Sequence, residues 1–166
     1  MVAGLGLGIA SVSAPTAAAS AVDSTVSHST APGPVTSLKV TAAAASSVSL
    51  SWVNPTSSSL AGVMLRRATG TKPPSSPTSG TLVAKIAKPG AKYKNTGLAP
   101  STTYSYTAFA YNAKSQFSAG VHVTTTTAPS PVTSLKVTGV TTTSVSLTWT
   151  DPASAYTSVV IRRATG

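Results

Sequence analysis

The sequence predicts an all-β protein: a seven-stranded antiparallel β-sandwich that is present once in full and is followed by the first three strands of a second copy. Three observations lead to this prediction. Only 8% of the 166 residues are charged, while Val, Thr, Ser, Gly and Pro are abundant, a composition that favours strands and turns over helices. Short alternations of apolar and polar residues recur between turn-forming residues. Finally, one stretch of the chain occurs twice.

The duplication sets the size of the repeating unit. The eight residues that begin at Pro34 return at Pro131, and Trp52 returns as Trp149, in both cases 97 residues later. A period of this size belongs to a whole domain, because solenoid repeats span only about 20 to 50 residues. The chain therefore contains one module and part of another.

A second duplicated stretch locates a variable loop. Arg-Arg-Ala-Thr-Gly occurs at 66–70 and again at 162–166, which is 96 residues later, so the second copy lacks one residue before this point. Surface loops accept such changes in length cheaply. We divide the chain into a signal-peptide-like segment, a linker, a complete module, a second linker and a truncated module, at residues 1–21, 22–31, 32–127, 128–130 and 131–166.

The strands expected in the complete module are short and separated by turns. Val48, Leu50 and Trp52 alternate with serine, which puts all three side chains on one buried face. Tyr104 and Tyr106 likewise share one face of a later strand. The expected strands lie at residues 35–42, 48–52, 62–67, 81–87, 91–95, 103–111 and 120–126. Seven short strands in about ninety residues are typical of a two-sheet sandwich.

Two further expectations follow from the same pattern, one about the faces of a strand and one about a connection. On the third strand, Val63 and Leu65 face one way while Met64 and Arg66 face the other. The segment that follows, Lys-Pro-Pro-Ser-Ser-Pro at 72–77, cannot hold a hydrogen-bonded ladder, so we expect an exposed connection there.

The first 22 residues are uncharged and indicate where in or outside the cell the protein is found. An apolar run at 2–10 is followed by small residues that end in Ala-Ser-Ala at 19–21, which has the A-x-A form of a signal-peptide cleavage site. The positively charged start of a signal peptide is absent. A transmembrane helix is the rival interpretation, since the uncharged run is long enough, but its Gly, Pro, Ala and Ser favour cleavage. We therefore expect a secreted or cell-surface protein with no stable membrane span after cleavage.

Several motifs of the first module together resemble the fibronectin type III domain. They are Trp52 on the second strand, the run from Leu98 to Tyr104 that reads L-x-P-x-T-x-Y, and Tyr106 after it. In that immunoglobulin-like family the L-x-P-x-T-x-Y segment forms a tyrosine corner, which implies that the Tyr104 hydroxyl bonds upstream backbone. The run that begins at Val63 is similar to modules of secreted bacterial proteins of actinobacterial type. The side chains expected in the cores are Trp52, Leu50, Leu98, Tyr104, Tyr106 and Trp149.

The chain departs at two places from the pattern of the family that it resembles. Human members that bind integrins carry Arg-Gly-Asp between the last two strands, whereas this chain has Asn-Ala-Lys-Ser-Gln-Phe at 112–117, which does not support cell adhesion by that route. Val63 stands where an aromatic residue is often found on the third strand, which should thin the core modestly.

Catalysis is not expected from this chain. Residues 31–127 contain no Asp or Glu, and the only acids, Asp23 and Asp151, lie outside the complete module. The histidines, His28 and His122, have neither acidic nor cysteine neighbours, so they cannot complete a catalytic triad or hold a metal. A glycosidase pair of carboxylates is also missing. We expect no enzyme activity, no metal and no cofactor, and we expect His122 to face solvent.

The net charge of +10 is the most distinctive remaining feature. A field of one sign attracts polyanions with little specificity, such as anionic cell-wall polymers, polysaccharide or lipid surfaces. Specific nucleic-acid binding is not expected, because no recognition motif or stacking platform accompanies the charges. The same residues could instead serve solubility or protect sheet edges. The residues proposed for polyanion contact are Lys85, Lys88, Lys92, Lys94, Arg66 and Arg67.

Two alternatives concern arginine and tyrosine. Arg66 and Arg67 recur in the second copy, which favours a role within the module such as covering the faces of Tyr or Trp. Tyr93 and Tyr111 could line a sugar-binding platform or simply pack across strands.

Three functions are compatible with the sequence. The first is a non-catalytic spacer that presents neighbouring domains of the same chain, which the proline-stiffened joint at 124–131 supports. The second is an accessory module that binds cell-wall polymer or polysaccharide and is attached to a glycoside hydrolase. The third is an adhesin array. Residues 131–166 supply strands for two different sheets and no tyrosine corner, so we expect them to be loosely ordered on their own.

Overall fold

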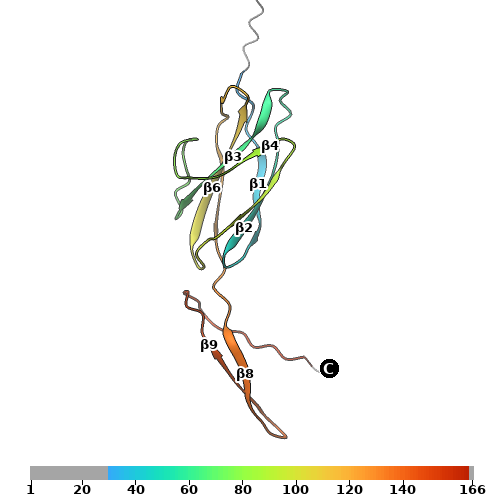
Figure 1. Cartoon of the computed structure of the whole chain (residues 1–166), viewed down its shortest axis with the longest axis vertical. Coiled ribbons are helices and arrows are strands. Elements are labelled where there is room, and N and C mark those ends of the chain that lie inside the picture. Colours follow the sequence, from blue (N-terminus) through green and yellow to red (C-terminus); the bar gives the residue numbers. More distant parts are fainter. Residues whose placement is uncertain (1–29, 165–166) are drawn as a thin grey trace, which may run out of the picture.

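The computed structural model describes residues 30–164, and in this range the chain forms nine β-strands and no helix (Figure 1). The strands are β1 (Thr36–Ala43), β2 (Ser47–Val53), β3 (Leu60–Thr69), β4 (Thr81–Ala87), β5 (Lys92–Thr96), β6 (Thr103–Asn112), β7 (Val121–Thr126), β8 (Thr133–Val140) and β9 (Val145–Thr150). The expected all-β class is confirmed. The signal-peptide-like segment at 1–21 and all but the last two residues of the linker at 22–31 lie outside the described residues.

The first seven strands form the expected sandwich. One sheet has three strands in the order β1-β2-β5, and the other has four in the order β4-β3-β6-β7, with every pair antiparallel. The chain changes sheet after β2, after β4 and after β5, so neighbours in sequence often lie in different layers. The bounds of β4 are the expected ones, and those of the other strands differ by at most two residues at either end, the largest difference being the extension of β3 at both ends.

The core lies between the two sheets and consists of the residues that the alternation predicts. Val48, Leu50 and Trp52 of β2 are buried, and β6 contributes Tyr104 and Tyr106. The complete buried cluster comprises Val35, Val48, Leu50, Trp52, Leu60, Val63, Leu65, Leu98, Tyr104, Tyr106, Ala108 and Ala110. Five of the six side chains expected in the cores belong to it. Trp149, the sixth, lies in the second hairpin and is half-buried.

The proline-rich segment corrects one expectation. Residues 71–80, which we call the proline strap, are exposed only in part, because Pro74 is buried and the segment is hydrogen-bonded to the outer face of the four-stranded sheet (Figure 1). The buried Thr107 hydroxyl donates a hydrogen bond of 2.8 Å to the carbonyl oxygen of Pro74, which is itself buried. Arg66 Nε donates to the carbonyl oxygen of Ser79 at 2.9 Å. Side chains of the four-stranded sheet therefore hold the proline strap in place through these two hydrogen bonds.

Glycine closes the far end of the proline strap. Gly80 has a φ of +66°, a backbone conformation that residues with a Cβ rarely adopt. A Cβ at this position would also lie 2.5 Å from the carbonyl oxygen of Arg67 and 2.9 Å from Pro74 Cγ. On the neighbouring part of the sheet the chain around Gly120 packs against Phe109 and Thr107. The outer face of β6 is therefore largely covered, which explains why Phe109 is only 2% exposed although it points away from the core.

The hydroxyl that holds the proline strap can be tested directly. Thr107→Val keeps the shape of the side chain but removes the donor to Pro74, which leaves a buried carbonyl unsatisfied. We expect the free energy of unfolding to fall by about 1–3 kcal/mol. Thr96→Val, at an exposed position of β5, is the control and should change it by less than about 0.5 kcal/mol. Urea unfolding followed by circular dichroism measures both; equal effects would contradict the anchoring role of Thr107.

The second module begins as a close structural copy of the first. β8 and β9 pair as β1 and β2 do, with register shifts at the corresponding places. Even an unusual backbone angle is repeated, since Ser37 and Ser134 both have positive φ, at 52° and 55°. The expected third strand is not formed among the described residues: 159–164 carry no ladder, and no counterpart of β6 lies there to pair with them.

Candidate functional site

The end of the first module that faces the second is stabilised by a tyrosine and a threonine. The Tyr104 hydroxyl accepts a hydrogen bond of 3.1 Å from the backbone N–H of Ala99, which confirms the upstream backbone bond expected of a tyrosine corner. Thr127, which is 2% exposed, donates from Oγ1 to the carbonyl oxygen of Ala99 at 2.7 Å and accepts from the N–H of Thr102 at 2.9 Å. The loop between β5 and β6 is thus tied to the residue that follows β7.

The joint between the modules carries three further hydrogen bonds. The N–H of Ser101 donates to the carbonyl oxygen of Ala128 at 3.1 Å, and the Ser101 hydroxyl donates to the carbonyl oxygen of Ala155. The N–H of Ser130 donates to Ser154 Oγ at 2.8 Å. Two of these bonds join the first module and its linker to the loop after β9. Figure 1 shows the second hairpin continuing along the long axis of the sandwich.

The contacts at the joint were not among the residues that the sequence singled out. Ser101, Thr127 and Ser154 occur in a chain rich in serine and threonine, so nothing distinguishes them from the exposed hydroxyl residues nearby. The only sequence feature that could have pointed to the joint is the L-x-P-x-T-x-Y segment. Ser101 occupies its second x position, and its hydroxyl bonds across the joint.

A polar cluster lies at the same end of the core. Arg67 Nη1 donates a hydrogen bond of 2.9 Å to Asn95 Oδ1, which also accepts one of 3.0 Å from the Tyr106 hydroxyl. The Arg67 guanidinium lies over the ring of Tyr104, with Cζ 5.0 Å from the ring centroid. Arg67 thus covers the face of an aromatic ring, which is the role considered above for the two arginines that recur in the second copy. Arg66 instead points to the outer face, where it holds the carbonyl of Ser79.

Burial at this cluster has a consequence at high pH. Burial raises the pKa of Tyr106 from 10.0 to about 12, and the nearby charge of Arg67 opposes part of that rise. The unfolded chain therefore loses the tyrosine proton first, so the free energy of unfolding should fall as the pH rises from about 10 to about 12. Tyr106→Phe should flatten this fall, although it also removes the bond to Asn95. Urea unfolding at several pH values measures the slope; an unchanged slope would contradict the assignment.

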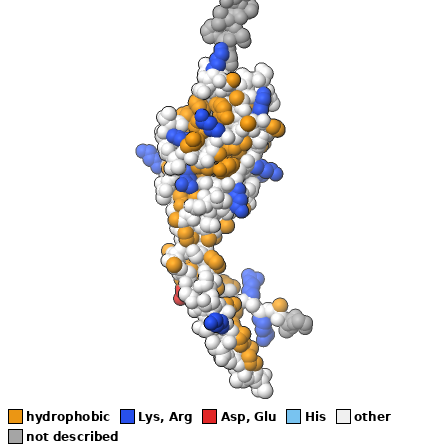
Figure 2. Space-filling view, viewed as in Figure 1, with side chains coloured by type: hydrophobic (Ala, Val, Ile, Leu, Met, Phe, Trp, Pro, Cys, Tyr) orange, Lys and Arg blue, Asp and Glu red, His pale blue; other side chains and the backbone are white. Residues whose placement is uncertain are grey.

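The four lysines proposed as one contact patch do not form one surface. Lys85 of β4 pairs with Met64 on the outer face of the four-stranded sheet. Lys92 and Lys94 of β5 lie on the outer face of the three-stranded sheet, and Lys88 lies in the turn between β4 and β5. The outer faces of a sandwich point in opposite directions. Figure 2 shows Lys and Arg side chains spread over the first module rather than gathered on one visible area.

Tyr93 and Tyr111 do not form a common platform either. Tyr93 packs inward against the core, whereas Tyr111 lies on the other sheet, where its ring centroid is 5.9 Å from that of Phe117. Cross-strand packing accounts for both rings.

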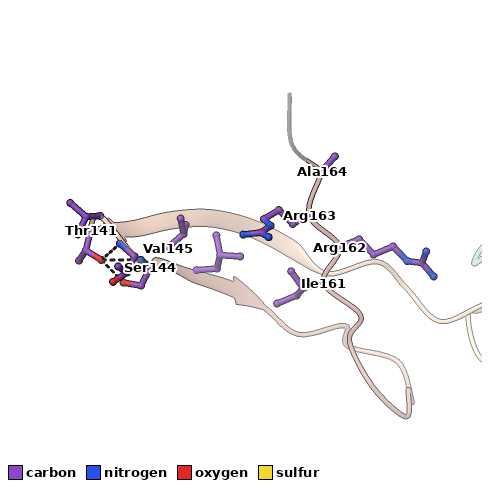
Figure 3. A pocket seen from close by; sticks show the side chains of 10 residues that line it. Thr141, Ser144, Val145, Ile161, Arg162, Arg163 and Ala164 are labelled. Atoms are coloured by element: carbon purple, nitrogen blue, oxygen red, sulfur yellow. Dashed lines mark hydrogen bonds between the residues drawn. The ribbon is translucent and has the colours of Figure 1, made fainter.

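A hollow in the second hairpin lies between the β8–β9 turn and residues 161–164 (Figure 3). Its lining includes Val145, Leu147, Ile161 and Arg163, with Arg162 pointing away in the view of Figure 3. The counterparts of these lining residues in the first module are Val48, Leu50, Leu65 and Arg67. The first three of these belong to the buried cluster of that module, and Arg67 closes its end. The hollow therefore corresponds in position to core space of the first module.

Catalytic and metal-binding groups are not brought together within residues 30–164. No group of three His, Cys, Asp or Glu residues lies close enough to hold a metal in this range. His122 is exposed on β7, as expected, and Asp151 accepts a hydrogen bond of 2.9 Å from Trp149 Nε1.

Comparison with known families agrees with this architecture. The chain matches the fibronectin type III domain over residues 33–124, which is more than half of its length and runs from before β1 into β7. The chain belongs to the fibronectin type III family. Fibronectin type III domains are generally non-catalytic modules of multidomain proteins.

Two chicken proteins resemble this chain in sequence or in fold. Receptor-type tyrosine-protein phosphatase eta from chicken is 35% identical over 138 residues, which is 82% of this chain but only 9% of that protein. The FN1–FN3 domains of chicken CNTN1 share the fold with a TM-score of 0.51 and 20% identity, covering 60% of this chain and 33% of that one. Within the described residues no helix is long and apolar enough to cross a membrane.

The turn between β6 and β7 shows what replaces Arg-Gly-Asp in this fibronectin type III module. Asn112 Oδ1 accepts hydrogen bonds from the N–H groups of Lys114 and Gln116, both at 3.0 Å. Asn112 Nδ2 donates to Gln116 Oε1 at 2.7 Å. The turn is closed by its own side chains and presents no acidic group.

Proposed function

We propose that this chain is a non-catalytic spacer that holds neighbouring domains of a secreted or cell-surface protein at a defined distance and orientation. The observation that carries the proposal is the joint, where Ser101 and Ser130 bond the loop after β9. A flexible linker would let two modules reorient freely, whereas prolines and hydrogen bonds restrict that freedom. Pro129 and Pro131 flank Ser130 in this linker.

The orientation of the second hairpin tests the spacer function. Residual dipolar couplings of the full chain report whether β8–β9 and the first module share one alignment. We expect one shared alignment in the unmodified chain. The double variant Ser101→Ala, Ser154→Ala removes both side-chain contacts across the joint and should give two different alignments. Ser46→Ala, Ser58→Ala, at exposed loop positions, is the control and should behave like the unmodified chain. Independent alignments in the unmodified chain would rule out a fixed joint.

The extracellular location rests on the sequence at 1–21 with its Ala-Ser-Ala end. Attaching a charged start to this segment and expressing the chain in a secreting host tests it. We expect a product in the medium whose first residue is Val22, as N-terminal sequencing would show. A product retained in the cells with its leader intact would contradict secretion by this segment.

A further inference from the structure

Three lysines share one exposed face of the first module. In the register of the three-stranded sheet, Lys39 of β1 lies opposite Ser51 of β2, and Ser51 lies opposite Lys92 of β5. Lys94, two residues after Lys92, lies opposite Ser49 in the next row. We call Lys39, Lys92 and Lys94 the lysine face. All three are exposed, and the half-buried serines of β2 separate β1 from β5.

The spacing within the lysine face follows from sheet geometry. Neighbouring strands lie about 4.8 Å apart, so the backbones of Lys39 and Lys92 are about 10 Å apart. Lys92 and Lys94 are separated by two residues of one strand, or about 6.7 Å. A shallow hollow lies beside Lys92 and Lys94, and its lining residues are Thr41, Ser49, Leu50, Lys92, Tyr93 and Lys94. The charges are close enough for one extended molecule to contact all three.

Among the described residues, no acidic side chain neutralises the lysine face. Between residues 30 and 164 the only carboxylate side chain belongs to Asp151, which lies in the second module and bonds Trp149. The other groups on this face, from Ser49, Ser51 and Thr41, are hydroxyls that can donate to anionic oxygens. The lysines therefore face solvent without a competing partner among the described side chains.

We propose that the lysine face binds a linear polyol-phosphate polymer. Lysine acts as a point charge that suits phosphate, whereas specific carboxylate recognition usually depends on the planar fork of arginine, which this face lacks. Single-stranded nucleic acid gains much of its affinity from stacking on aromatic rings. Trp52 is buried and Tyr93 is half-buried against the core, although Tyr93 also borders the hollow, so the face offers no fully exposed ring on which a base could stack.

This proposal goes beyond the spacer function and does not depend on it. The lysine face lies on the side of the first module, while the spacer function rests on the joint at its end. A failure of polymer binding would leave the joint unaffected, and a flexible joint would leave the lysine face intact. The two proposals are tested by different measurements.

Binding of a poly(glycerol phosphate) chain, measured by isothermal titration calorimetry at several salt concentrations, tests the proposal. The test variant is Lys39→Gln, Lys92→Gln, Lys94→Gln. Its matched control is Lys72→Gln, Lys85→Gln, Lys114→Gln, which removes the same charge from exposed positions elsewhere on the module. Circular dichroism establishes that both variants are folded. Poly(uridylic acid) and a sulfated glycan serve as alternative polymers.

We expect the test variant to bind the phosphate polymer at least about ten-fold more weakly than the control variant. A flexible polyanion releases roughly 0.7 counterion per phosphate neutralised, so three contacts predict a slope of log K against log salt of about −2, which the test variant should lose. Equal weakening in both variants would show that only net charge matters, as would be the case for lysines that serve solubility. Absence of binding at low salt, or tighter binding of either alternative polymer, would overturn the proposal.

Discussion

Replacing Leu50 by alanine is expected to lower the free energy of unfolding of the first module by about 3 kcal/mol. Leu50 is 1% exposed and lies at the centre of β2, within the buried cluster between the two sheets. Removing a buried leucine side chain loses its transfer free energy and leaves a void that the surrounding sheets fill only partly. Urea unfolding followed by far-UV circular dichroism measures the change.

The duplication supplies a matched control for this substitution. Leu147 occupies the same position of the second hairpin, within the same Val-Ser-Leu sequence, but it is only half-buried. Leu147→Ala should leave the unfolding transition of the first module within about 0.5 kcal/mol of its original value. If both substitutions destabilised that transition equally, the second hairpin would have to contribute to the core of the first module, contrary to the observed packing.

A single added methyl group at Gly62 is expected to lower the free energy of unfolding about as much as the loss of the Leu50 side chain does. A Cβ on Gly62 would lie 2.3 Å from the carbonyl oxygen of Ile86 and 2.8 Å from the hydroxyl of Tyr111. The carbonyl of Ile86 belongs to the backbone of β4, which pairs with β3 at Gly62, so it cannot withdraw without disturbing that ladder. Inserting atoms into well-packed regions usually costs about 1–3 kcal/mol, and a contact with backbone should place Gly62→Ala at the upper end of that range.

Gly139 provides the comparison for Gly62. It also lies in a strand, but a Cβ there would meet only Ser146 Cβ at 3.7 Å, an ordinary contact. Gly139→Ala should therefore be neutral or slightly stabilising, since alanine loses less backbone freedom than glycine on folding. Thermal unfolding of the two variants side by side decides the matter. A Gly62→Ala protein as stable as the Gly139→Ala protein would mean that β3 and β4 can separate at no cost.

The strands and the core follow from local sequence because they depend on alternation. The side chains of Val48, Leu50 and Trp52 are buried in the structure for the same reason that they were expected to be, namely that one face of a half-buried strand must be apolar. The tyrosine corner is equally local, since Tyr104 and Ala99 are five residues apart. The L-x-P-x-T-x-Y motif is enough to predict it.

Surfaces depend on which strands pair, and that information is not local. Lys85 and Lys92 are seven residues apart, yet the chain changes sheet between them, so they lie on opposite outer faces. Lys39 joins Lys92 only through the register of β2. The burial of Pro74 likewise depends on Thr107, which is 33 residues away. Charge clusters read along a sequence are therefore poor guides to charge clusters on a sandwich.

The proline strap also determines where this domain can be engineered. A long, proline-rich connection is ordinarily the first choice for inserting a tag or a fluorescent label, but an insertion at Pro74 would displace the cover of β6. The better position is the loop between β2 and β3, around Ser58, which is exposed and lies in the region where the two copies differ in length. A label placed there would sit at the end of the sandwich away from the joint, and so would leave the neighbouring module undisturbed.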